Sequence, residues 1–148
     1  MLKIIEDIVG ERVSLSIDKF IPENKEKEYV PVILYHIILN ENRKIIGHCS
    51  ARLGWNEYMY YCGHIGFSVQ EVYRGNGYAV EAVNLVKKVF KENNIKQVYI
   101  TNNPDNKASI RVCEKLGAKF IKRMAFSEEE LKRFAASDSY KNIWKLKI

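Results

Sequence analysis

A glycine-rich turn between a strand-like run and a helical run constrains the fold of this chain most strongly. Residues 63–69 alternate as a strand does, residues 78–93 have helical spacing, and the turn between them reads Arg74-Gly75-Asn76-Gly77-Tyr78-Ala79. Gly75 and Gly77 lack a Cβ, so the backbone there can turn tightly and approach a ligand closely. The first N–H groups of the next helix have no intrahelical acceptor and lie at the positive end of the helix dipole. The turn therefore predicts a site for an anion such as phosphate.

The run that follows the turn predicts an amphipathic helix. Between Ala79 and Phe90 the apolar residues recur in steps of four, three and four, and most charged residues fall elsewhere. A short strand is expected at residues 98–101, followed by a second helix at about residues 106–116 that Gly117 closes as a C-terminal cap. This part of the chain thus predicts the order strand, helix, strand, helix.

The remaining β-rich runs flank this central pattern. The runs at residues 29–39 and 44–53 predict a hairpin, because turn residues separate them. The last two runs flank Ser127, whose Ser-x-x-Glu spacing predicts a capping box at the start of a short helix. The expected outer strands are residues 12–17, 29–39, 44–53, 119–126 and 140–148. With 148 residues the chain has an ordinary size for one core, so we expect a single domain over residues 1–148.

Composition narrows the class of ligand. Lys and Arg outnumber Asp and Glu by 24 to 18, and the net charge of +6 favours an anionic ligand, for which a phosphate-bearing cofactor suffices. The lysines are spread along the chain and do not alternate with aromatic residues, so the pattern does not favour nucleic acid as a partner. No apolar run approaches the roughly 18 residues of a membrane span, so no membrane partner is expected.

Cysteine usage and the first residues predict a cytoplasmic protein. The first ten residues lack the basic region and cleavage site of a signal peptide, and an odd number of cysteines in apolar surroundings suits reduced thiols. A zinc site is not expected, because His48 and Cys49 point to opposite faces of their strand and no Cys-x-x-Cys pair exists. The histidines and cysteines considered for zinc are His48, Cys49, Cys62 and His64. The remaining cysteine is Cys113.

Two familiar phosphate motifs do not fit the turn. The chain has no Gly-x-x-x-x-Gly-Lys-Ser/Thr, and a dinucleotide fingerprint would need a third glycine where Val80 stands. What remains is Arg74-x-x-Gly77-x-Ala79, followed by Asn106-Lys107-Ala108-Ser109 and Glu114-Lys115-Leu116-Gly117-Ala118. In order, spacing and context these motifs resemble those of the GNAT superfamily of N-acetyltransferases over residues 63–120. The run Gly63-His64-Ile65-Gly66-Phe67 is similar to one found in a bacterial group of that superfamily.

The resemblance implies an α/β (α+β) fold and acetyl-CoA as the acetyl donor. It implies a mixed, mostly antiparallel sheet that is flanked by helices and split at the fourth predicted strand. Pantetheine would pair there with the backbone of Phe67, Ser68 and Val69, and the N–H of Val69 would polarise the thioester carbonyl. The pyrophosphate would lie on the amides of Gly75, Asn76, Gly77, Tyr78 and Ala79, with Arg74 beside it, and Asn106 would contact pantetheine.

The resemblance also suggests an acid for the leaving thiolate. Many members carry a tyrosine four residues before the glycine that ends the second helix, and this chain has Cys113 at that position. Some relatives use the serine of Asn-x-x-Ser, so Ser109 is the candidate that stabilises or protonates the CoA thiolate. The alternative is that Ser109 caps or bonds within its own helix, as serine often does. Cys113 is expected to be a packing residue, since nothing suggests a base beside it.

His64 is the candidate general base. An imidazole titrates near neutrality and is able to remove the proton that an amine must lose, directly or through water. In the strand pattern, His64 shares a face with Cys62, Gly66 and Ser68. The alternative is a hydrogen-bonded structural histidine.

The acceptor is the part of the reaction that the sequence defines least. We expect direct transfer of acetyl to a primary amine, with a small molecule as the first choice, although the short segment 21–29 stands where the superfamily usually has two helices. A peptide or protein amine, and a non-catalytic module that binds or senses acyl-CoA, are the alternatives. The oligomeric state is open, with a homodimer among the options. An aromatic turn either borders the acceptor pocket or forms a subunit contact: Trp55, Tyr58, Tyr60 and Tyr61.

Overall fold

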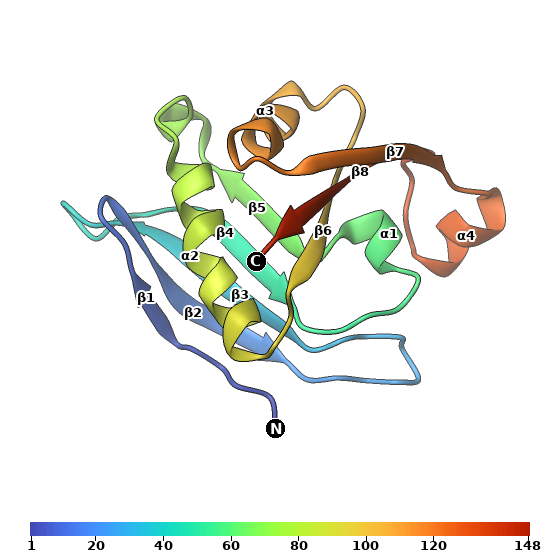
Figure 1. Ribbon diagram of the computed structural model, residues 1–148, viewed down its shortest axis with the longest axis horizontal. Helices are drawn as coiled ribbons and strands as arrows, with labels where there is room; N and C mark the ends of the chain where they lie inside the picture. Colours follow the sequence, from blue (N-terminus) through green and yellow to red (C-terminus); the bar gives the residue numbers. More distant parts are fainter.

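Two antiparallel β-sheets flanked by helices make up the computed structural model, which describes residues 1–148 (Figure 1). The larger sheet has the order β1-β2-β3-β4-β5, with strands β1 (Asp7–Val9), β2 (Val13–Ile21), β3 (Val32–Leu39), β4 (Ile45–Arg52) and β5 (Ile65–Val69). The smaller sheet has the order β6-β8-β7, with strands β6 (Gln97–Asn102), β7 (Lys119–Ala125) and β8 (Tyr140–Lys147). The helices are α1 (Met59–Cys62), α2 (Tyr78–Glu92), α3 (Lys107–Lys115) and α4 (Glu128–Arg133), with a 3-10 turn η1 (Glu71–Tyr73).

This architecture confirms the predicted combination of a mostly antiparallel sheet with flanking helices. The predicted sheet was mixed, but all six strand pairings are antiparallel. The reason is that β5 and β6, the two strands that α2 connects, share no ladder and belong to different sheets. The split therefore falls at the predicted strand, which is the fifth in the structure because β1 was not predicted.

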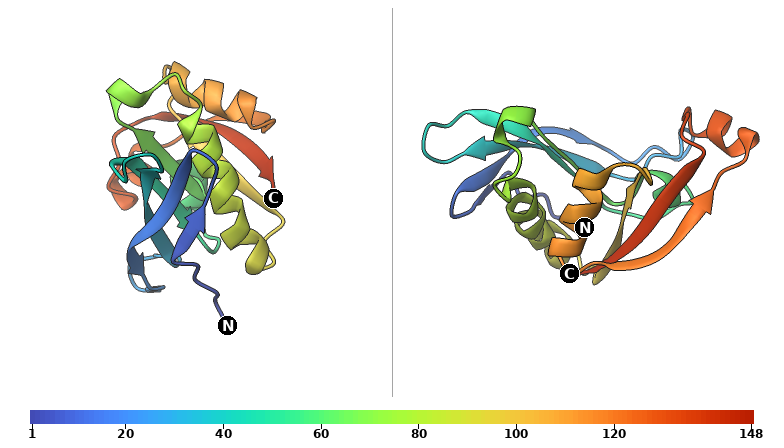
Figure 2. Two further views of the ribbon diagram at one scale, coloured as in Figure 1. Left: turned by 90° about the vertical axis from the view of Figure 1, so that its left-hand side faces the viewer. Right: turned by 90° about the horizontal axis from the view of Figure 1, so that it is seen from above.

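The core lies between the larger sheet and α2. Helix α2 buries the apolar face that its spacing predicted, and Val83, Val86 and Phe90 are fully buried there. Figure 2 shows α2 and α3 on one side of the larger sheet and no helix on the other. The connection between β2 and β3 holds only an isolated bridge between Asn24 and Tyr29, so the face opposite α2 stays uncovered.

The start of β5 differs from the prediction. Residues 63 and 64 were expected to be strand, but Cys62 ends α1, Gly63 follows as its cap with φ +71°, and β5 begins at Ile65. A residue with a Cβ rarely adopts that conformation, so the glycine allows the chain to leave the helix and enter β5 two residues later. No helix of the structure combines the length and the apolar character that crossing a membrane requires.

His64 joins the two sheets at the closed end of the split. Its backbone N–H donates to the carbonyl of Tyr99 in β6 (2.8 Å), and its carbonyl accepts from Arg52 N–H in β4 (2.7 Å). Beyond this point β5 and β6 form no further pairing. The arrangement leaves the cavity-facing edge of β5 without a partner strand.

Candidate functional site

A cavity of about 730 Å³ opens where β5, the glycine-rich turn, the start of α2 and the length of α3 converge. Ten of the predicted site residues line it: Phe67, Ser68, Val69, Arg74, Gly75, Gly77, Tyr78, Ala79, Asn106 and Ser109. Further lining residues include two cations of α3 that the sequence analysis did not single out, Arg111 and Lys115. The cavity therefore combines an unpaired strand edge, a helix start and positive charge.

The glycine-rich turn has the backbone conformation that its sequence predicted. Gly75 and Gly77 adopt φ values of +84° and +79°, which favour glycine. Gly77 is the N-cap of α2, and no side chain caps the helix there. The N–H groups of Tyr78, Ala79 and Val80 have no acceptor within the protein. They lie at the positive end of a 15-residue helix, so they are available to an anion.

The register between β4 and β5 determines which backbone groups of β5 face the cavity. Gln70 N–H donates to Ile46 O, and Arg52 N–H donates to His64 O. Hydrogen-bonded pairs alternate in an antiparallel ladder, so Ser68, opposite His48, also turns its backbone toward β4. Phe67 and Val69 turn theirs toward the open edge. Of the three residues predicted to pair with pantetheine, the backbones of Phe67 and Val69 face the cavity.

Arg74 folds back onto the end of β5. Its Nε donates to the carbonyl oxygen of Val69 (2.8 Å), so the side chain fixes the strand end while it lines the cavity. Asn76 is the one predicted cofactor contact that does not line the cavity. Its Nδ2 donates to Tyr73 O (3.0 Å) and its carbonyl accepts from Arg12 (2.7 Å), so it shapes the turn.

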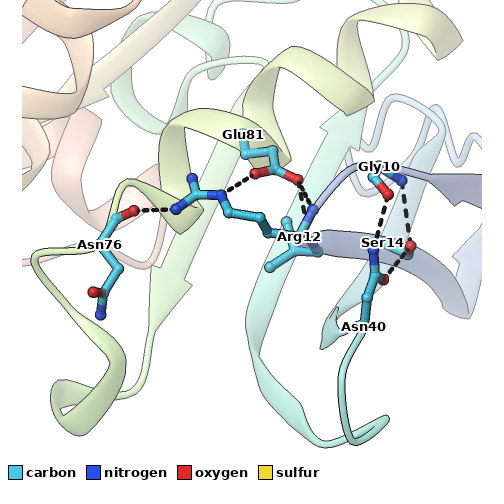
Figure 3. A network of polar contacts seen from close by, with 7 residues as sticks. Gly10, Arg12, Ser14, Asn40, Asn76 and Glu81 are labelled. Atoms are coloured by element: carbon cyan, nitrogen blue, oxygen red, sulfur yellow. Dashed lines mark hydrogen bonds and ion pairs between the residues drawn. The ribbon is translucent and has the colours of Figure 1, made fainter.

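A network around Arg12 and Glu81 fastens the turn to the β1–β2 hairpin (Figure 3). Arg12 Nε lies 2.9 Å from Glu81 Oε1, and the N–H groups of Arg12 and Val13 donate to Glu81 Oε2 at 2.8 and 3.0 Å. Burial acts to raise the pKa of Glu81, but these hydrogen bonds and the Arg12 charge outweigh it and lower that pKa. This network could not be predicted from the sequence, because Arg12 and Glu81 are 69 residues apart.

We expect Arg12→Ala to weaken the binding of CoA by about threefold to tenfold, since the turn loses a charge-assisted restraint. The arginine is half exposed, so we expect little change in the free energy of unfolding. Calorimetric titration with CoA measures the effect. Lys3→Ala is the matched control, because it removes a cation whose ion pair with Glu92 lies at the far end of the same helix. If both variants lost the same affinity for CoA, the effect would come from the change in net charge, and the prediction that Arg12 restrains the turn would be wrong.

Ser109 lies on α3, where its backbone and side chain have separate partners. Asn106 Oδ1 caps the helix by accepting from Ser109 N–H (3.1 Å). Ser109 Oγ accepts from Nδ2 of Asn102 (3.2 Å), a buried residue at the end of β6. The predicted strand stopped at Thr101, so Asn102 was missed. Cys113 is fully buried, and burial raises the pKa of its thiol to about 12, as suits a packing residue.

His64 lies outside the large cavity. Only 6% of it is exposed; Nε2 lies 3.0 Å from Gly54 O, and Nδ1 accepts from Tyr99 N–H at 2.9 Å. Burial, assisted by the charge of Arg52 and opposed by the bond to Gly54, lowers its pKa to about 4. Both ring nitrogens are occupied by backbone groups, so the contacts favour the structural role over the general base.

The aromatic turn lies outside the large cavity: Trp55 packs on His64, while Tyr58 and Tyr61 pack on Phe134. The Trp55 ring stacks on His64, with centroids 5.9 Å apart, and also contacts Tyr60 and Tyr99. Trp55, His64 and Tyr99 line a second, smaller cavity of about 380 Å³.

The structure contains no group of three or more His, Cys, Asp or Glu side chains arranged to hold a metal ion.

Comparison with known proteins gives one family and a set of similar folds. A family model described as Acetyltransferase (GNAT) domain matches residues 11–119. An uncharacterized N-acetyltransferase, YnaD of Bacillus subtilis (strain 168), is 32% identical over 84 residues, which are 56% of this chain and 48% of that protein. The chain thus spans about half the length of the curated relative that it matches.

Two solved structures share the fold at low sequence identity. The ribosomal-protein-S5-alanine acetyltransferase from Vibrio fischeri has a TM-score of 0.67 and 15% identity, over 95% of this chain and 96% of that one. The microcin C7 self-immunity acetyltransferase MccE, solved in complex with acetyl-CoA and AMP, has a TM-score of 0.60 and 19% identity, over 84% and 63%. At these identities the likeness establishes the architecture.

Proposed function

Because this chain belongs to the GNAT family of acetyltransferases, we propose that it moves an acetyl group from acetyl-CoA directly to a primary amine. The observation that carries the proposal is the meeting, in one cavity, of the unpaired N–H groups of α2 with the unpaired edge of β5. We further propose that residues 1–148 act as one domain in the cytoplasm, which the three free cysteines suit.

The residues of the cavity fit a long anionic thioester such as acetyl-CoA. The N–H groups of Tyr78, Ala79 and Val80 suit the pyrophosphate, and Arg111 and Lys115 add positive charge to the same cavity. The open edge of β5 offers the groups that an amide-containing chain needs to bind as an added strand. Bound there, acetyl-CoA supplies an activated acyl group.

Val69 is the residue that we propose as the donor to the thioester carbonyl. Its N–H faces the cavity by register, and the bond from Arg74 Nε to its carbonyl holds the strand end in place. A donor fixed in advance costs no reorganisation when charge develops on the carbonyl oxygen, and such donors contribute roughly 100-fold to 1000-fold in rate. Ser109 is the proposed donor to the leaving sulfur, while His64 is proposed to be structural.

A small-molecule amine is the first candidate acceptor, and a polypeptide amine is the second. The observation that favours the second is the uncovered face of the larger sheet, where residues 22–31 between β2 and β3 contain no helix. An uncovered face admits a large acceptor to the β5 edge without a closed pocket. The ribosomal-protein acetyltransferase among the structures of similar fold acts on a protein substrate by its description, which is consistent with this second candidate.

The test is thiol release from acetyl-CoA in the presence of two amine panels, with the acetylated product identified by mass spectrometry. One panel holds small primary amines, and the other holds peptides with free amino termini matched to N-acetylated peptides as controls. Amine-dependent release is expected, and the panel that supports it identifies the acceptor class. Tight binding of acetyl-CoA with no release from either panel would favour a non-catalytic acyl-CoA-binding module. Failure to bind acetyl-CoA would overturn both functions.

A further inference from the structure

Three side chains from three different elements form a directed chain of hydrogen bonds that ends at the large cavity. Trp144 Nε1 in β8 donates to Asn102 Oδ1 (3.2 Å), and Asn102 Nδ2 donates to Ser109 Oγ (3.2 Å). Trp144 and Asn102 are 8% and 4% exposed, so the bond between them is buried, whereas the bond from Asn102 to Ser109 is partly buried. Ser109 lines the cavity.

Trp144 determines which way the Asn102 amide points. An indole nitrogen is a donor only, so the group that faces it must be the amide oxygen. The NH₂ group then faces Ser109, and it also approaches Cys113 Sγ at 3.6 Å. The reverse orientation would bring two donors together at Trp144 and leave Ser109 facing an acceptor. The direction of the chain is therefore fixed by its first member.

The direction of this chain determines what the Ser109 hydroxyl is able to do. Its oxygen accepts from Asn102, so its hydrogen must point elsewhere, and Ser109 Oγ donates to no group of the protein. Serine in a helix often donates to the carbonyl four residues before it, and that bond is not made. The hydroxyl hydrogen is left for an acceptor in the cavity.

We propose that Asn102 is a positioning residue that directs the Ser109 hydroxyl at the sulfur of bound CoA, an inference that rests on the proposed function. In the transfer, the amine nitrogen forms a bond to the acyl carbon and the carbon–sulfur bond breaks. The electron pair stays on sulfur, the proton of the amine passes to solvent, and the Ser109 O–H donates a hydrogen bond to the thiolate. Aligned donors polarise one another, so the chain from Trp144 strengthens this last bond.

The experiment compares the binding of CoA with that of desulfo-CoA, which lacks the sulfur, by calorimetry over a range of pH. The ratio of their association constants isolates the contacts of the sulfur. In the unmodified protein this ratio is expected to rise as pH increases through the titration of the thiol, because the O–H of Ser109 favours the thiolate. Ser109→Ala is expected to lower the ratio at high pH by roughly tenfold to 100-fold, the range for a hydrogen bond to a charged group.

Asn102→Asp tests the positioning role. A carboxylate of the same shape accepts from Trp144 and also from Ser109, so the hydroxyl turns away from the cavity and the ratio falls by at least tenfold, about as far as in Ser109→Ala. The negative charge itself also disfavours a thiolate. The same change in a Ser109→Ala background measures that charge effect alone, and the positioning role predicts a larger effect when Ser109 is present.

The matched control is Asn142→Asp. Asn142 is 5% exposed and lies opposite Asn102 in the β6–β8 register, so the variant places a carboxylate on the neighbouring strand without touching Ser109. The ratio of the association constants of CoA and desulfo-CoA is expected to stay unchanged in this variant.

Trp144→Phe provides a second test that introduces no charge. The Asn102 amide loses the bond that fixes its direction, so the ratio is expected to fall. Retained binding of desulfo-CoA shows for each variant that the fold is intact.

Each outcome separates this inference from the proposed function. If neither CoA nor desulfo-CoA binds the unmodified protein, the proposed function is overturned and the positioning role with it. If both bind, and Asn102→Asp lowers the ratio equally with and without Ser109, the positioning role alone is overturned. If Asn102→Asp misfolds, Trp144→Phe decides: an unchanged ratio contradicts the role, and a reduced ratio supports it.

Discussion

Gly77→Val is expected to weaken acetyl-CoA binding by at least about 100-fold, because each lost hydrogen bond to a charged phosphate costs roughly 1.5 to 3 kcal/mol. Gly77 lines the cavity with φ +79°, a conformation that a β-branched residue scarcely adopts. An added Cβ would lie 3.4 Å from Arg12 Nη2, against the network that fastens the turn. The backbone must therefore shift, and the N–H groups of α2 lose their arrangement. Calorimetric titration with acetyl-CoA measures the loss.

Gly117→Val is the matched control for Gly77→Val. Gly117 has φ +74° and no atom within 4 Å of an added Cβ, so the variant carries the same backbone strain at the end of α3, outside the residues that line the cavity. We expect it to lose stability to a similar degree and to keep binding acetyl-CoA. Unchanged binding in a folded Gly77→Val protein would mean that the turn holds no phosphate, and the proposed cofactor site would be wrong.

Acidification is expected to destabilise the protein through His64. The folded state holds the pKa of His64 at about 4, against 6.5 for an ordinary histidine, so the unfolded chain binds the proton more readily. The stabilising contribution is complete above about pH 6.5 and is lost progressively as pH falls toward about 4. The shift corresponds to up to about 3 kcal/mol of unfolding free energy. Denaturant unfolding of the unmodified protein and of His64→Asn at several pH values measures the difference.

His64→Asn is expected to be less stable than the unmodified protein at pH 7 and to lose less stability on acidification. Its turnover per folded molecule is expected to stay the same, because His64 lies outside the large cavity. His48→Asn is the control, since it removes an exposed histidine from the neighbouring strand. If His64→Asn abolished turnover while remaining folded, the structural role would be refuted and the general base restored.

Features that depend on neighbouring residues could be predicted from the sequence. The glycine-rich turn and α2 follow from local chemistry, because Gly75 and Gly77 permit positive φ and apolar residues recur at helical spacing. The capping box at Ser127 is present for the same reason. Each of these requires only a few adjacent residues to agree.

Features that depend on distant partners could not be predicted. The role of His64 depends on a hydrogen bond from Tyr99, which is 35 residues away in the chain. The orientation of Asn102 depends on Trp144, which is 42 residues away. A one-residue change of register would also exchange the cavity-facing backbone of Val69 for that of Ser68. Sequence spacing placed both residues in the right strand, and only the β4 pairing distinguished them.

Because of the split between the sheets, the binding of a ligand is also expected to change the free energy of unfolding. Backbone hydrogen bonds join β5 to β6 only at the His64 end. A molecule that pairs with the open edge of β5 would therefore supply some of the hydrogen bonds that a partner strand would otherwise provide. Binding that favours the native state adds a stabilisation that grows with the logarithm of ligand concentration. The amides of Phe67 and Val69, which no strand protects, are where this linkage would register first, as slowed exchange with solvent deuterium.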